Sequence, residues 1–186
     1  MEKTNFNTKE NQTIGRELLI LCLNTGTPEG PVWSPVGKRV ADSTMSYDWK
    51  KESSTDVLGN NYTQLSKPQI TQTFDPWQLD AADKAQKMIW DTGIRDQDPD
   101  ALANMDLMVV HKYVGTAKTA MFAERYSACA ITPTSLGGAG GGKLAMPIEV
   151  TYGGERTTGT AAIAEGAFTF TPDGTAAAAA TNTTTT

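Results

Sequence analysis

The sequence is poor in the residues from which most catalytic and metal sites are built. It contains one histidine, His111, and two cysteines, Cys22 and Cys129. The cysteines lie far apart with no C-x-x-C pair, so we expect two small buried hydrophobic residues rather than a disulfide or metal ligands. No nucleophile motif accompanies His111, which we expect to be a structural or surface residue. We therefore predict no enzymatic activity, no catalytic or metal-binding residues and no cofactor.

Long apolar runs and an excess of basic charge are also missing. The polar N-terminus lacks the apolar stretch of a signal peptide, and no run is long enough to span a membrane, so we expect synthesis in a cytosol-like compartment. The net charge is −5. Tight binding of nucleic acid needs clustered lysine and arginine, so this charge argues against nucleic acid as a tightly held ligand.

A glycine-rich segment matches a nucleotide-binding motif only in part. Gly137–Lys143 has the G-x-x-x-x-G-K spacing of a phosphate-binding loop. Leu144 stands where a serine or threonine would hold magnesium, and Pro147 prevents the helix whose N-terminus would hold the phosphate. We expect a flexible connection between strands.

An acidic segment matches a calcium loop only in part. Asp96, Asp98 and Asp100 have the D-x-D-x-D spacing, but alanine replaces the glycine at the sixth position and leucine replaces the glutamate at the twelfth. Because Pro99 follows Asp98, a capped helical turn is the better explanation.

The clearest structural pattern lies between Phe74 and Gly93 and predicts one amphipathic helix. Asp75 occupies an N-cap position, Pro76 the first helical position, and Gln78 completes a capping box. Gly93 is predicted to end the helix. The predicted buried face consists of Trp77, Leu79, Ala81, Ala82, Ala85, Met88 and Ile89.

Most of the remaining sequence has the pattern of strands and turns, which predicts a mainly β fold. We expect a single domain over residues 1–172 with a flexible N-terminus at 1–15, and a low-complexity, disordered tail at 173–186. The expected strands are Arg16–Leu23, Ala41–Lys50, Gln69–Phe74, Asp106–Val114, Thr119–Ile131, Met146–Tyr152, Glu155–Ile163 and Ala167–Pro172.

The order of these pieces resembles the tail tube (major tail) proteins of long-tailed bacteriophages. The resemblance covers roughly residues 16–172. It depends on the succession RELLILCL, VGK with DSTMSYDW, a long polar loop, QTFDPWQLDAADKAQKMIW, DLMVVHKYV with MFAERYSACAI, and IEVTYGGERTTG with FTFTP.

That resemblance implies a small β-sandwich or partly open barrel flanked by one α-helix. It also implies a virion protein, made in the host bacterial cytoplasm, that forms hexameric rings stacked into a tail tube. DNA would pass through the tube during ejection without tight binding. Tape measure, terminator, and baseplate or tip proteins would be further partners.

A carbohydrate-binding or adhesion module is the alternative function. Its basis is the set of four tryptophans, because aromatic rings can form a sugar-binding platform. Scattered tryptophans in a small β domain are more often core or interface residues. They are Trp33, Trp49, Trp77 and Trp90.

The long segment Lys50–Lys67 is the predicted contact between rings. It shows neither helical nor strand periodicity, and a loop of this length in a compact domain is usually functional. We expect an adaptable arm that orders against the neighbouring ring. Charged residues for recognition and apolar anchors are both present: Lys50, Lys51, Glu52, Asp56, Val57, Leu58, Tyr62 and Leu65.

Overall fold

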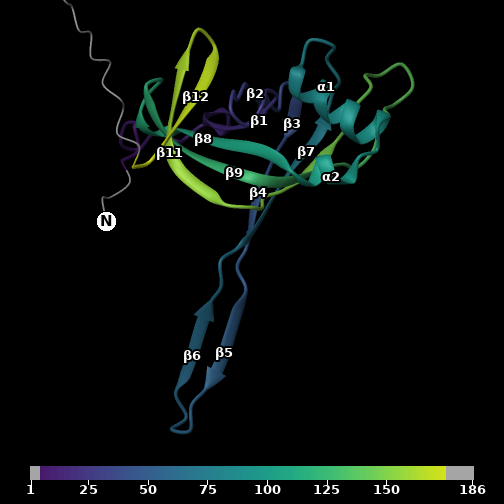
Figure 1. Cartoon of the computed structure of the whole chain (residues 1–186). Helices are drawn as coiled ribbons and strands as arrows, with labels where there is room; N and C mark the ends of the chain where they lie inside the picture. The colour runs from purple at the N-terminus through teal and green to yellow at the C-terminus, as the bar shows by residue number, and fades with distance from the viewer. Residues whose placement is uncertain (1–4, 175–186) are drawn as a thin grey trace, which may run out of the picture.

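The protein is a closed six-stranded β-barrel with a sheet that extends beyond it, as seen in a computed structural model that describes residues 5–174 (Figure 1). Each strand of the ring pairs in antiparallel fashion with its neighbours, and β9 pairs with β11 to close it. In ring order the strands are β11 (Arg156–Ala164), β12 (Ala167–Pro172), β2 (Trp33–Val36), β1 (Leu19–Asn24), β8 (Met105–Thr116) and β9 (Ala120–Pro133).

The extension begins on β9, which is long enough to belong to both parts. Its first half pairs with β11, whereas Ala130–Pro133 pairs with β10 (Ile148–Thr151). Beyond β10 the sheet continues to β7 (Gln69–Trp77), which carries β3 (Val40–Asp42) and β4 (Met45–Asp48) on its other side. The prediction of a mainly β fold, a small sandwich or partly open barrel, is confirmed in its class; the barrel is closed because β9 pairs with β11.

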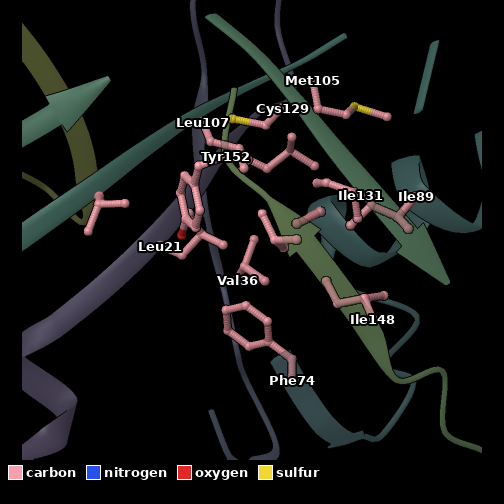
Figure 2. Close-up of a cluster of buried hydrophobic side chains, with 14 of the residues drawn as sticks. Leu21, Val36, Phe74, Ile89, Met105, Leu107, Cys129, Ile131, Ile148 and Tyr152 are labelled. Carbon is pink, nitrogen blue, oxygen red and sulfur yellow. The ribbon is translucent and has the colours of Figure 1, made fainter. Parts of the chain in front are cut away.

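The protein has two apolar cores, a first core inside the barrel and a second core on its outer face, and β1 contributes to both. Cys22 and Met108 belong to a cluster contributed by the six ring strands, which fills the barrel. Leu21 and Leu23 point to the opposite face, where side chains of β1, β2, β8, β9 and β10 converge with Ile89 (Figure 2). Strand β1 is thus buried on both faces, as predicted, although it begins at Leu19 because the 3-10 turn η1 (Arg16–Leu18) precedes it.

The helix packs on the second core but begins later than predicted. Asp83 caps α1 (Lys84–Trp90), and its carboxylate accepts hydrogen bonds from the backbone N–H groups of Ala85 (3.0 Å) and Gln86 (3.1 Å). A π-helical turn, η2 (Asp91–Arg95), continues it. A shorter helix, α2 (Pro99–Ala103), follows, and Asp98 caps it as predicted.

The predicted roles of Asp75, Pro76 and Gly93 in the helix are therefore wrong. Asp75 and Pro76 lie in β7, where Asp75 pairs with Asp42, and Gly93 lies within η2. Pairing of β7 with β10 and β3 keeps this segment extended, so tertiary contacts override the local capping pattern.

The predicted buried face of this segment is nevertheless largely correct. Trp77, Ala85 and Ile89 are fully buried, and Leu79 and Met88 are partly buried against the same core, whereas Ala81 and Ala82 are exposed. Trp77 reaches the core from the end of a strand rather than from the helix, and its indole N–H donates to the Lys38 carbonyl at 3.1 Å.

The two ends of the chain differ in what the structure describes. Within the N-terminal segment predicted to be flexible, Phe6 forms a bridge with Val114 and stacks on Tyr113 at 5.9 Å between ring centroids. Most of the C-terminal tail predicted to be disordered, residues 175–186, lies outside the described residues.

Candidate functional site

A two-stranded hairpin projects from the body of the molecule (Figure 1). It consists of β5 (Lys51–Thr55) and β6 (Asn61–Leu65), which pair with each other and with no other strand of the described chain. Every residue of both strands is exposed. The prediction that residues 50–67 lack strand structure is wrong, because cross-strand pairing of polar residues with each other creates a strand that has no apolar face.

The hairpin tip is a hydrogen-bonded turn built around Asp56. Its carboxylate accepts hydrogen bonds from the backbone N–H groups of Leu58 (2.9 Å) and Asn60 (2.8 Å), from the Asn60 amide (2.9 Å) and from the Tyr62 hydroxyl (2.5 Å). The Tyr62 hydrogen bond and those from Asn60 lower the pKa of Asp56 to about 2. Gly59 occupies the left-handed region at φ +84°, as such a turn requires.

This turn presents two apolar side chains to solvent. Val57 is fully exposed and Leu58 is 82% exposed. Of the other residues predicted for the inter-ring contact, Lys51 stands opposite Leu65, whereas Glu52 stands opposite Gln64. The predicted residues thus form an exposed arm with an apolar tip, in which the Asp56 carboxylate accepts hydrogen bonds from Leu58 and Tyr62.

The base of the hairpin carries further exposed aromatic residues. Tyr47 is 47% exposed and Trp49 is 51% exposed. The sequence predicts one continuous strand over Ala41–Lys50 with these residues on its buried side. Instead the segment divides into β3 and β4, and both aromatic side chains lie where the chain leaves the body for the hairpin.

A groove of about 790 Å³ lies among β1, β2, β3 and the start of α1. In Figure 1 these elements occupy the end of the molecule opposite to the hairpin tip. The apolar side chains that line the groove are Leu19, Ile20, Leu21, Pro35, Val36, Val40, Ala41, Phe74 and Ala82.

Charged side chains border this groove. Basic residues at its edge are Arg16, Lys38 and Lys84, and acidic residues are Glu17 and Asp83. Asp83 is buried and caps α1, so its carboxylate is already occupied by backbone N–H groups. Lys38 pairs with Asp80 at 2.7 Å, so the charged residues left at the edge are the basic Arg16 and Lys84 and the acidic Glu17.

A partly buried polar cluster lies on the outer face of the barrel around the buried Glu124. Its carboxylate accepts a hydrogen bond from the Tyr126 hydroxyl (2.8 Å) and pairs with Arg156 (2.5 Å). His111 Nδ1 lies 2.8 Å from the Tyr113 hydroxyl, and burial lowers the pKa of this histidine. The Glu124–Arg156 pair joins β9 to β11, whereas His111 of β8 bonds to Tyr113, and its Nε2 has no hydrogen-bond partner among the described residues. The sequence does not single out Glu124. The available signal is a charged residue on the same strand face as Phe122 and Tyr126.

The other candidate motifs have structural explanations. Gly137 exchanges backbone hydrogen bonds with Ala145 (3.0 and 2.8 Å), so the glycine-rich segment is a β9–β10 connection. Asp96 pairs with Arg95 and Asp98 caps α2. Within residues 5–174, no group of histidine, cysteine, aspartate or glutamate is arranged to hold a metal ion.

The four tryptophans do not form a common platform. Trp77 is fully buried and Trp33 is 5% exposed, with the Arg125 guanidinium 5.6 Å above the Trp33 ring. Trp90 packs partly buried against the second core, so Trp49 is the exposed one. This arrangement does not favour the carbohydrate-binding alternative.

Comparisons with known proteins identify the fold. No protein-family model matches the sequence, and no curated protein matches it significantly. Among solved structures, the sheath/tube terminator of an extracellular contractile injection system (PVC) in the extended state has a TM-score of 0.52 at 10% identity, covering 81% of this chain and 99% of that one.

Two further structures are similar at lower scores. The tube-terminating cap of the anti-feeding prophage has a TM-score of 0.49 at 13% identity, covering 83% of this chain and 95% of that one. A chain of the PVC sheath–tube complex scores 0.47 at 10% identity, covering 81% and 94%. No helix among residues 5–174 has the length and apolar character needed to cross a membrane. The chain thus shares the fold of the PVC sheath/tube terminator.

Proposed function

We propose that this protein is a structural subunit of a phage tail tube, in which copies form hexameric rings that stack through the projecting hairpin. The main support for this proposal is the hairpin itself, whose strands are exposed on both faces and whose tip exposes Val57 and Leu58 to water. On this proposal the tube belongs to a virion tail and conducts DNA.

The energetics of an isolated hairpin favour a partner. A two-stranded hairpin is marginally stable in water unless a third strand or another element packs on it. Here β5 and β6 pair with no other strand of the described chain. Docking on an adjacent ring would bury the exposed apolar residues and supply the missing packing.

The open sheet supplies a second means of association. Strands β3 and β4 end the extension, and within residues 5–174 each of them pairs only with β7. An unpaired edge is a template for a strand of another molecule. Both proposed contacts are heterologous, because each joins two different surfaces. Edge pairing between neighbouring subunits would close into a ring, whereas hairpin contacts between rings would extend the stack along an axis.

A tube terminator is the second candidate, favoured by the fold likeness to a protein described as a sheath/tube terminator. A terminator would form a single ring that ends a tube, whereas a tube subunit would stack without limit. Electron microscopy of the purified protein separates the two, because the first gives isolated rings and the second gives tubes.

The test of the proposal is removal of the arm. Replacement of Ser53–Gln64 by a short Gly-Ser linker should leave the fold intact, because the replaced segment pairs only within the hairpin. Circular dichroism should show wild-type melting and electron microscopy should show no long tubes. Wild-type tubes from this variant would refute the role of the hairpin.

A milder pair of variants controls for general loss of surface hydrophobicity. Leu58 and Leu144 are both exposed leucines, at 82% and 52%. Leu58→Ser should impair tube formation, whereas Leu144→Ser, in the β9–β10 connection, should not. Equal effects of the two substitutions would contradict a specific contact at the tip.

A further inference from the structure

We infer that the groove among β1, β2, β3 and α1 receives the hairpin tip, Val57–Leu58, of a second copy of this chain. The inference rests on the proposed function, and it adds the receiving site. The occupant is a second copy because β5 and β6 extend away from β1, β2, β3 and α1 of their own molecule, the elements that line the groove (Figure 1).

The shape and lining of the groove suit an apolar insert. Its volume of about 790 Å³ lies within the range of roughly 300–1,000 Å³ that is usual for binding clefts. The walls include Leu21, Val36 and Phe74, which are themselves part of the buried core and are therefore held rigidly. A rigid apolar cleft binds with little ordering cost on its own side.

The tip has the complementary chemistry. Val57 and Leu58 are the most exposed large apolar residues of the described chain. The four hydrogen bonds to the Asp56 carboxylate fix the turn that carries them, so the insert is preorganised as well. Association of two preorganised surfaces gains apolar burial without ordering a flexible loop.

Charge favours the same pairing. Asp56 is the single charged residue between Ser53 and Gln64. As an aspartate it is ionised at neutral pH, and its hydrogen bonds lower its pKa further, to about 2. At the groove edge, Asp83 caps α1 and Lys38 pairs with Asp80 (2.7 Å), which leaves Arg16 and Lys84 beside one acidic side chain, Glu17. A negative tip therefore approaches a predominantly positive edge.

The positions of tip and groove determine how the contact repeats. They lie at opposite ends of the molecule, so a contact between them is head to tail and each copy can both give a tip and receive one (Figure 1). A heterologous contact of this kind extends along an axis without limit. It gives the stacking direction of the proposed tube.

Disulfide trapping tests the inference. Leu58→Cys protein and Ala82→Cys protein are mixed while dilute, concentrated together and oxidised; Ala82 is exposed and lines the groove. The native cysteines do not interfere, because burial raises the pKa of Cys22 to about 12 and that of Cys129 to about 11. A disulfide-linked dimer is expected, and Val57→Cys serves as a second tip variant.

The matched control is Ala164→Cys, which places an exposed cysteine at the end of β11, outside the groove. It should give only trace dimer with Leu58→Cys. Equal yields from Ala82→Cys and Ala164→Cys would overturn the inference.

Electron microscopy of the same mixtures separates failure of the site from failure of the function. Tubes without the Leu58–Ala82 disulfide would overturn the groove as receiver and leave the tube proposal intact. Absence of rings and tubes at high concentration would overturn both. If the disulfide forms only in a chain that ends at Gly174, residues 175–186 occupy the groove and the inference is overturned.

Discussion

The position of the helix N-terminus predicts a specific difference between two aspartate variants. Asp83→Ala removes the acceptor for the backbone N–H groups of Ala85 and Gln86, both of which are buried. Loss of an N-cap costs about 0.5–2 kcal/mol, and a buried donor left unpaired adds to that cost. We expect destabilisation of roughly 2 kcal/mol, at the upper end of the range for caps.

Thermal unfolding followed by circular dichroism measures this difference. For a chain of this size, a loss of 2 kcal/mol lowers the melting temperature by about 4–8 °C. Asp75→Ala is the matched control: Asp75 is exposed in β7, so its substitution should change stability by less than about 0.5 kcal/mol. A larger effect at Asp75 than at Asp83 would refute our placement of the helix start.

Four further predictions follow from individual residues and from net charge. Ile89→Asp places an unpaired charge at a fully buried position and should cost at least about 3 kcal/mol in urea unfolding; near wild-type stability would show that the helix face is not buried. Burial lowers the folded-state pKa of His111, whose neighbours are Tyr113, Glu124 and Arg156. The unfolded state therefore binds more protons, and the free energy of unfolding should fall as pH drops below about 6.5. His111→Gln should remove this pH dependence, and an unchanged pH dependence would contradict the argument. Lys84→Glu should preserve the melting temperature, because an acidic residue suits the first helical turn, yet reduce tube formation in electron microscopy; unimpaired tubes would contradict the charge argument. With a net charge of −5, duplex DNA should bind more weakly than about 100 μM at physiological salt, and micromolar affinity by fluorescence anisotropy would contradict passage without retention.

Strands with apolar periodicity could be predicted from the sequence. Asp106–Val114 and Ala167–Pro172 correspond closely to β8 and β12, because each has apolar residues that the fold buries. Burial of Trp77 and Ile89 was also predictable from their spacing. In these segments local pattern and tertiary environment agree, which is why sequence analysis succeeds.

Two predictions, the helix start at Asp75 and the absence of strands in Lys50–Lys67, are wrong because strand pairing decides both conformations. Around Asp75 the capping pattern is satisfied locally, but pairing of β7 with β3 and β10 decides the conformation. In Lys50–Lys67 no residue is buried apart from partial cover at Asp56, so no apolar alternation reveals β5 and β6. The turn residues Asp56, Gly59 and Asn60 were the available signal for a hairpin.

The groove could not be predicted from the sequence at all. Its lining comes from segments as distant as Arg16 and Lys84, which only the barrel, the β3–β7 pairing and the helix bring together. Individually these residues have the pattern of ordinary strand and helix positions. Their common site depends on topology, which short-range periodicity does not encode.

The most direct test of the tube proposal is cryo-electron microscopy of the concentrated, purified protein. We predict stacked hexameric rings in which Val57 and Leu58 of one subunit contact a subunit of the adjacent ring. A protein that stays monomeric at high concentration, or tubes in which the hairpin tip remains in solvent, would contradict the account.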